Sequence, residues 1–200
     1  MKKLRTAING FGRIGRIVFR ANFLNPKVEI VGINDPNPIE QLAYLLKYDS
    51  AHGRFTGKIT HTEKSLIVDG IEIPYSMERD PAKLPWKALD VDLVFESTGV
   101  FTDREKAAAH LTAGAKRVMI TAPGKGVDGT FVYVVNHEQF DSAKHIIFSN
   151  ASCTTNSLAP LAQVLHKNFI IKNGFMTTIH AVTNDQRTLD LPHPDPRRGR

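Results

Sequence analysis

The chain has 200 residues, of which 42% are hydrophobic and 23% are charged, and its formal net charge at pH 7 is +6. This composition is typical of a soluble globular protein with a sizeable core. No apolar run approaches the roughly 18 residues of a membrane span, and the basic N-terminus is not followed by a segment of signal-peptide character. One cysteine excludes an internal disulfide and fits a reducing compartment. We therefore expect a cytoplasmic protein with no membrane contact.

The positive charge could serve nucleic acid or a phosphorylated small molecule. Three of the last four residues are arginines. Arginines and aromatic side chains are not interleaved, however, as a base-stacking surface requires. Nucleic-acid binding is therefore only a weak secondary hypothesis.

The chain begins with the pattern of a dinucleotide-binding βαβ unit. Residues 3–9 predict a strand, residues 10–15 read Gly-Phe-Gly-Arg-Ile-Gly, and helical spacing follows until Asn25-Pro26. A second strand is predicted at residues 28–34, and Asp35 follows it, 20 residues beyond Gly15. A Gly-x-Gly-x-x-Gly run is weak alone, but strand, glycine turn, helix, strand and acid together are the context it requires.

Each glycine of this run has a predicted role. Gly10 permits a tight turn, Gly12 lets the backbone approach a pyrophosphate, and Gly15 lets helix and strand pack closely. The helix N-terminus then faces the phosphates. Asp35 would accept hydrogen bonds from both ribose hydroxyls and repel a 2′-phosphate, which favours NAD over NADP. The alternative, glycines that serve packing alone, is less favoured.

Strands alternate with helices through the middle of the chain, and this alternation predicts a doubly wound parallel sheet. The strand predicted at residues 91–96 ends in Ser97-Thr98-Gly99, and ligands bind at such carboxyl ends. The other predicted elements are a helix at 38–48 capped by Asn37, a hairpin turning at Asp69-Gly70, a helix at 104–113 with Gly114 as its C-cap, and strands at 116–121 and 131–136.

The single cysteine, Cys153, lies between a predicted strand end at residues 146–148 and a helix predicted to run to about Phe169. Serine, threonine and asparagine side chains, which favour helix caps, surround it. At a helix N-terminus, unpaired N–H groups and the macrodipole stabilise a thiolate. The polar surroundings favour a nucleophile over an inert core thiol.

His180 follows 27 residues later, at the end of a strand predicted at residues 174–180. One helix and one returning strand separate it from Cys153, so the two side chains could meet. The imidazole would then assist thiolate formation and act as general acid and base. The alternative is a histidine with a purely structural role.

Several of these motifs resemble those of phosphorylating glyceraldehyde-3-phosphate dehydrogenases, over the N-terminal three-fifths of that family's chain. The resemblance implies a Rossmann-type NAD-binding domain at residues 1–150 and the beginning of an α+β catalytic domain, apparently truncated, at residues 151–200. The matching segments are residues 9–16, 45–50, 96–101, 151–156 and 180–186.

The resemblance also implies a reaction and an assembly. Glyceraldehyde 3-phosphate, inorganic phosphate and NAD would give 1,3-bisphosphoglycerate, a step of glycolysis, through a thiohemiacetal and a thioester on Cys153. His180 would take the hydroxyl proton. A homotetramer is implied, and no metal is.

Further residues are placed in the site by motif match. Cofactor-contacting positions, with the glycine loop included, are Gly10, Phe11, Gly12, Arg13, Ile14, Gly15, Asp35, Arg79, Thr98, Gly99 and Thr121. Substrate- or phosphate-contacting positions are Ser152, Cys153, Thr154, Thr183 and Arg198. Two alternatives stay open. One is an erythrose-4-phosphate dehydrogenase, and the other is a non-catalytic NAD-binding piece that could contact RNA through its basic surface.

Overall fold

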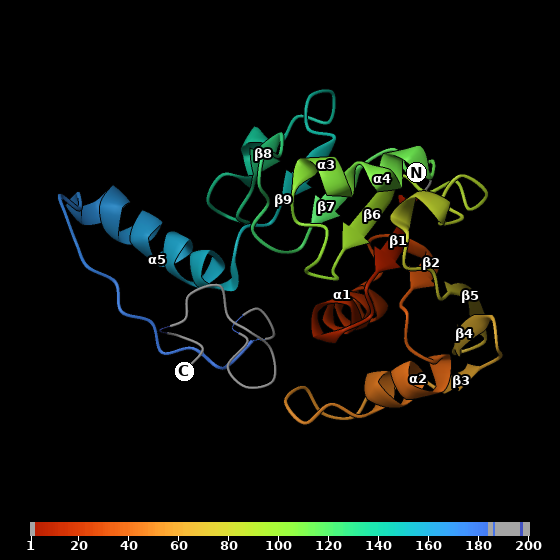
Figure 1. The fold of residues 1–200 in the computed structure, drawn as a ribbon. Helices are drawn as coiled ribbons and strands as arrows, with labels where there is room; N and C mark the ends of the chain where they lie inside the picture. The colour runs from red at the N-terminus through yellow and green to blue at the C-terminus, as the bar shows by residue number, and fades with distance from the viewer. Residues whose placement is uncertain (1–2, 184–185, 187–196, 198–200) are drawn as a thin grey trace. The chain divides into compact units, whose positions relative to one another are not determined.

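A computed structural model describes residues 3–183, 186 and 197 of the chain. Its first elements are β1 (Arg5–Asn9), α1 (Arg13–Leu24) and β2 (Glu29–Asn34), and β1 pairs with β2 in parallel (Figure 1). The βαβ unit predicted from the glycine run is therefore confirmed.

The strands form one mixed sheet, mostly parallel, in the order β3-β4-β5-β2-β1-β6-β7-β9-β8. Of the strand pairs formed by residues that the structure describes, only β3–β4 and β4–β5 are antiparallel. The remaining strands are β3 (Ile59–His61), β4 (Ser65–Val68), β5 (Ile71–Ser76), β6 (Leu93–Glu96), β7 (Val118–Ile120), β8 (Gly129–Thr130) and β9 (Ile147–Ser149). The predicted doubly wound, parallel architecture is confirmed.

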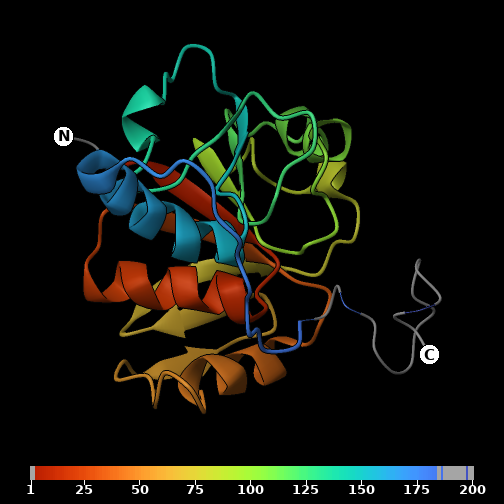
Figure 2. The ribbon, with the colours of Figure 1, turned by 90° about the vertical axis from the view of Figure 1, so that its left-hand side faces the viewer.

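Helices lie on both faces of this sheet, with α1 opposite α3 and α4 (Figures 1 and 2). Among the described residues, no helix has the length and apolarity needed to cross a membrane. Besides α1, the described residues form the helices α2 (Ile39–Lys47), α3 (Arg104–Ala107), α4 (Ala109–Thr112) and α5 (Cys153–Phe169), with 3₁₀ turns at Pro81–Lys83 and His137–Gln139.

Alternating side chains of β1 pack into two of the three hydrophobic clusters that the described residues form. Ile8 of β1 packs into a cluster with Phe19 of α1 and Leu46 of α2. The adjacent Ala7 belongs to a second cluster around Trp86, which is fully buried. Period-two alternation thus sends neighbouring residues of one strand to opposite layers, as a sheet covered on both faces requires.

The hairpin between β4 and β5 turns at Asp69-Gly70, as predicted. Both residues have positive φ, 48° and 83°, which is the geometry of a two-residue turn that matches strand twist. Asp69 also accepts a hydrogen bond from the backbone N–H of Lys58 at 2.6 Å, so its side chain ties the turn to the strand beside it.

Asn37 is not the cap of α2, so that prediction was wrong. Pro38 is the N-cap residue, with no side-chain cap bond. The Asn37 amide donates instead to the Asp35 carboxylate at 2.8 Å. A side chain that folds back on the preceding acid cannot also cap the helix that follows.

The helix predicted at residues 104–113 is broken into α3 and α4 at Ala108, whose backbone N–H bonds to the carbonyls of both Arg104 and Lys106.

The predicted strand at residues 131–136 is wrong. The amide of Asn136 closes a turn there, donating to the Thr130 carbonyl at 3.0 Å and accepting from the Val132 N–H at 2.8 Å. That side chain competes with strand pairing for the backbone.

The strand predicted at residues 174–180 is also absent, since no strand of the described part of the chain pairs with it. Phe175 and Ile179 are fully exposed in this segment. Apolar alternation favours a strand, but the strand forms only beside a neighbour that satisfies its backbone groups.

The chain divides into two compact units, residues 1–159 and 160–200. The functional boundary at residue 150 stays a prediction.

Leu46→Ala should lower the free energy of unfolding by about 2–5 kcal/mol, because it empties space in a fully buried cluster. Its neighbour Leu45 is 42% exposed on the same helix. Leu45→Ala is the matched control and should change the value by no more than about 0.5 kcal/mol. Urea denaturation measures both. Equal losses in the two variants would contradict the assigned packing of α2.

Candidate functional site

The loops that follow β1 and β6 meet at the centre of the sheet. Strand β1 pairs with β2 on one side and with β6 on the other, so the chain order reverses between β1 and β6. In open parallel sheets, ligands bind outside the carboxyl ends of the strands at such a switch point. Residues 10–15 and 97–99 occupy this position.

Gly10 makes the contact between these two loops. Its φ is +88°, and a Cβ at this position would lie 2.7 Å from the Thr98 backbone nitrogen. Its N–H donates to the Asn34 carbonyl at 2.8 Å, which ties the turn to the end of β2. Both the backbone conformation and the lack of space therefore require glycine here.

The other two glycines of the run differ in their surroundings. A Cβ on Gly15 would lie 2.1 Å from the Gly10 carbonyl oxygen, so helix and turn are in direct backbone contact. A Cβ on Gly12 would meet nothing within 4 Å. The space over Gly12 is open, which fits the predicted approach of a pyrophosphate to the backbone.

The N-terminus of α1 opens beside Gly12. Its first turn carries no acidic residue, and Arg13 and Ile14 are exposed there. Arg16 donates to the Phe11 carbonyl at 2.9 Å, and burial lowers the pKa of its guanidinium, with Asp49 and Asp35 opposing that effect. An uncapped helix start with basic neighbours and no acid is suited to an anion such as a phosphate.

Asp35 is buried at the end of β2 and binds the glycine loop directly. One carboxylate oxygen accepts from the Phe11 N–H at 2.8 Å, and the other accepts from the backbone N–H of Asn37 at 3.0 Å and from its side-chain amide. The sequence predicted that Asp35 binds the ribose hydroxyls, but it did not indicate that this carboxylate also hydrogen-bonds the glycine loop. Phe11 itself is 1% exposed and packs edge-on against Phe19, so only its backbone faces the loop.

Three more predicted cofactor positions lie at the ends of β6 and β7. Thr98 is half-buried and Gly99 is exposed in the loop after β6. The Thr121 hydroxyl donates to the Glu96 carbonyl at 3.1 Å, which attaches the end of β7 to the same loop. Arg79 is exposed after β5. Beneath these residues lies a buried pair, Glu96 and His110, that no sequence pattern indicated.

Cys153 is exposed and is the first residue of the 17-residue helix α5, as predicted. The Ser152 hydroxyl accepts from the Thr155 N–H at 2.9 Å, which is an N-cap bond. Asn156 donates to the carbonyls of Asn150 and Ser152 at 2.7 and 2.9 Å and fixes the turn that leads into the helix. The thiol therefore lies where the helix dipole favours an anion.

Thr154 is half-buried in the first turn of α5. The other predicted residues belong to the second compact unit or lie outside the described residues. His180 is exposed, with Nδ1 2.6 Å from the Ala181 carbonyl oxygen. The Thr183 N–H donates to the Gln186 side chain at 2.9 Å. Arg198 lies outside the described residues. The pairing of Cys153 with His180 stays a prediction, because the two belong to different units.

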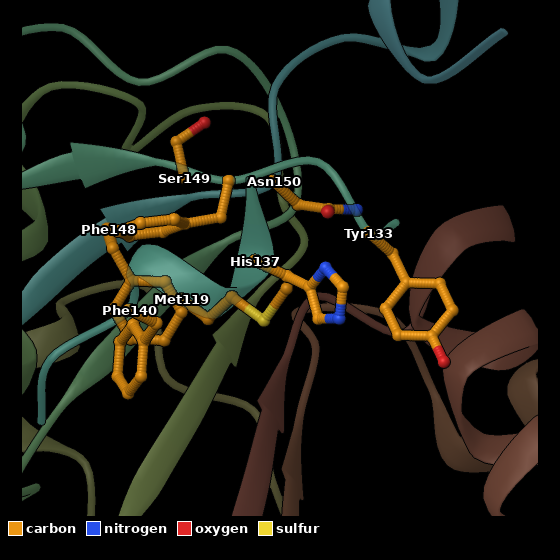
Figure 3. A pocket seen from close by; sticks show the side chains of 8 residues that line it. Met119, Tyr133, His137, Phe140, Phe148, Ser149 and Asn150 are labelled. Atoms are coloured by element: carbon orange, nitrogen blue, oxygen red, sulfur yellow. The ribbon is translucent and has the colours of Figure 1, made fainter. Parts of the chain in front are cut away.

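A pocket of about 300 Å³ opens between β7, β9 and the segment after β8 (Figure 3). Its wall is mostly aromatic and apolar, and none of its residues is a predicted cofactor or substrate contact. The lining residues are Met119, Phe131, Tyr133, His137, Phe140, Phe148, Ser149 and Asn150. A wall of this kind does not suit a phosphorylated ligand.

Two family models match the chain. Residues 4–104 match the glyceraldehyde 3-phosphate dehydrogenase NAD binding domain, and residues 152–200 match the C-terminal domain of the same enzyme. Curated glyceraldehyde-3-phosphate dehydrogenases from Thermotoga maritima and Geobacillus stearothermophilus are 59% and 55% identical to it. Each alignment covers 98% of this chain and 59% of the relative. The chain thus spans about three-fifths of the length of these relatives.

Gly12→Ala should weaken NAD binding at least tenfold, because the new methyl group would occupy the open space over the loop. It should change the free energy of unfolding by at most about 1 kcal/mol. Gly10→Ala should instead cost about 1–3 kcal/mol of stability, since it adds both strain and overlap. Calorimetric NAD titration and urea denaturation separate the two effects.

Gly174→Ala is the control for this pair, because a Cβ there also meets nothing and the position has no predicted role. It should leave both NAD affinity and stability unchanged. If Gly12→Ala bound NAD as tightly as the parent chain, the pyrophosphate would not lie over Gly12.

Proposed function

Because the chain belongs to the glyceraldehyde 3-phosphate dehydrogenase family, we propose that it carries the NAD site and the nucleophile of the phosphorylating enzyme. The reaction is the oxidation of glyceraldehyde 3-phosphate, with inorganic phosphate, to 1,3-bisphosphoglycerate. One observation supports it above the others. Cys153 starts α5 four residues after β9 ends, and β9 is parallel to the strands that carry the glycine loop.

Four residues of chain can span at most about 14 Å. The Cα atom of Cys153 therefore lies within about that distance of the end of β9. The carboxyl end of β9 is on the same side of the sheet as the carboxyl ends of β1 and β6, because these strands are parallel. The Ser149 hydroxyl shortens the path, because it accepts from the Ala151 N–H at 3.0 Å and turns the chain back. This placement suits a thiol that holds an aldehyde beside a bound dinucleotide.

In the proposed reaction, His180 takes the thiol proton of Cys153 and the thiolate attacks the aldehyde carbon to form a C–S bond. The C=O π bond opens to an oxyanion, which takes that proton back from His180 and gives a thiohemiacetal. His180 takes the hydroxyl proton as the carbon loses hydride, and a thioester remains on Cys153. NAD, when bound, would be the hydride acceptor. A phosphate oxygen then attacks the thioester carbon, the C–S bond breaks, and the acyl phosphate leaves with the thiolate restored.

The anionic groups of substrate and phosphate need donors near the thiol. Ser152, Thr154 and Thr183 supply hydroxyls at or beyond the start of α5, and Arg198 supplies a guanidinium by motif match. The functional boundary near residue 150, the homotetramer and the cytoplasmic location are further parts of this proposal. The relatives described above carry the name of the glyceraldehyde enzyme, so an erythrose-4-phosphate dehydrogenase is not favoured.

Cys153→Ser should abolish NADH production from glyceraldehyde 3-phosphate, NAD and phosphate, because a serine hydroxyl is a far weaker nucleophile than a thiolate. NAD affinity should stay within about twofold of the parent chain, since the thiol is not part of the glycine loop. Ser157→Ala, an exposed change in the same helix, is the control and should keep full activity. Absorbance of NADH and calorimetric NAD titration are the measurements.

Normal turnover in Cys153→Ser would remove the nucleophile assignment. A parent chain that binds NAD but forms no NADH would instead support the reading of these residues as a non-catalytic NAD-binding piece.

Asp35→Asn should weaken NAD about tenfold and reduce the preference for NAD over NADP, because the neutral amide no longer repels a 2′-phosphate. The amide oxygen can still accept one of the loop bonds that Asp35 now makes. Glu40→Gln, an exposed change in the following helix, is the control. The measurement is the ratio of the two dissociation constants, and an unchanged ratio would exclude Asp35 from the ribose site.

A further inference from the structure

A chain of buried polar side chains runs under the loops of the dinucleotide site. His110 is fully buried, and Glu96, at the end of β6, is 1% exposed. The His110 Nε2 atom lies 2.8 Å from Glu96 Oε2, and the Trp86 indole nitrogen lies 3.0 Å from His110 Nδ1. None of these three side chains has a part in the reaction proposed above.

The partners of His110 fix its protonation. An indole N–H can only donate, so the Trp86 bond requires a bare Nδ1 on His110. Its Nε2 atom therefore carries the proton and donates to Glu96. The imidazole is neutral and has one orientation, held from both sides.

Glu96 is an acceptor for donors on all sides. Oε2 accepts from His110 and from the Asn9 amide at 2.6 Å. These two donor nitrogens are 3.4 Å apart, as expected when both point at one oxygen. Oε1 accepts from the Thr98 N–H at 2.9 Å and from the Thr98 hydroxyl. Such a set of donors suits an ionised carboxylate, whose burial is tolerated because each oxygen is bonded.

This carboxylate connects the core to both loops of the switch point. Thr98 is the residue whose backbone lies against Gly10. On the other side, the Asn34 amide donates to Asn9 Oδ1 at 2.7 Å, and Asn34 also accepts from the Glu78 N–H at 2.9 Å. A displacement of Glu96 would therefore move the loop after β6, with the ends of β1 and β2 attached to it.

We propose that His110 and Glu96 are positioning residues of the dinucleotide site. The His110 Nε2–H holds the Glu96 carboxylate, and that carboxylate holds Thr98 against Gly10 in the geometry that binds NAD. This inference rests on the proposed NAD site. A fully satisfied buried network rigidifies what it contacts, whereas apolar residues in the same space would fill it without aiming any donor or acceptor at Thr98.

Two amide substitutions at residue 110 distinguish a positioning role of His110 from a role in packing alone. His110→Gln can place an amide N–H where Nε2 lies and so keeps the donor to Glu96. His110→Asn can place an oxygen where Nδ1 lies and so keeps only the acceptor for Trp86. Both remove the ring from the same buried site, so both should unfold at lower urea concentration than the parent chain.

The NAD affinity of the 200-residue chain should nevertheless differ between the two. We expect His110→Asn to weaken NAD about tenfold, the effect of losing a hydrogen bond to a charged group. His110→Gln should stay within about threefold of the parent chain. Equal affinities in the two variants, or a larger loss in His110→Gln, would overturn the positioning role and leave His110 as a core residue for Trp86. A parent chain that binds no NAD would overturn the NAD site itself.

A measurement on the unsubstituted chain covers the case in which a variant does not fold. The ¹⁵N chemical shifts of the His110 ring report its tautomer, and the signal is assigned by its absence from either variant or from a chain labelled at selected histidines. A neutral ring protonated on Nε2 at neutral pH is the expected result. A ring protonated on Nδ1 alone, or on both nitrogens, would contradict the proposed hydrogen bonds of His110, because Trp86 could then not donate to Nδ1.

Discussion

The close approach of three backbone segments at Gly10 is the constraint on which the site depends. Gly10 touches Thr98 from the loop after β6, and Gly15 of α1 touches the Gly10 carbonyl. Side chains are excluded from both contacts, so the first turn of α1 lies directly over the sheet edge. Gly12, which lies between these two glycines in the sequence, is exposed, and a Cβ there would meet nothing within 4 Å. A bulkier residue at Gly10 or Gly15 would lift the helix start away from the sheet.

Close backbone packing brings the loops together, and hydrogen bonds from two buried carboxylates fix their orientation. Asp35 fixes the Phe11 N–H from the β2 side, and Glu96 fixes Thr98 from the β6 side. Each carboxylate is satisfied by several donors, so neither can shift without leaving a buried charge unpaired. The two acids therefore set the separation of the loops across which a dinucleotide would lie.

The sequence predicted the parts of this arrangement that local signals determine. The βαβ unit, the turn at Asp69-Gly70 and the helix that starts at Cys153 each follow from residues within one segment. The features that the sequence did not predict correctly depend on contacts between segments that are distant in the chain. The alternation of residues 174–180 favoured a strand, but pairing decides whether one forms. The Glu96–His110 contact depends on the packing of α4 on the sheet, and the spacing of the two residues along the chain does not reveal it.

The same reasoning explains why the thiol could be found by sequence while its surroundings could not. A cysteine preceded by Ser152, in a run of small polar residues before an apolar helix, is a local pattern, and the cap bond at Ser152 is its direct result. The position of that helix start relative to the nucleotide loops follows from strand order, because β9 pairs with β7 and β7 with β6. Parallel pairing brings the carboxyl ends of these strands to one edge. The helix start with its cysteine, after the last of them, and the glycine loop, after the first, thus share that edge through the topology of the sheet.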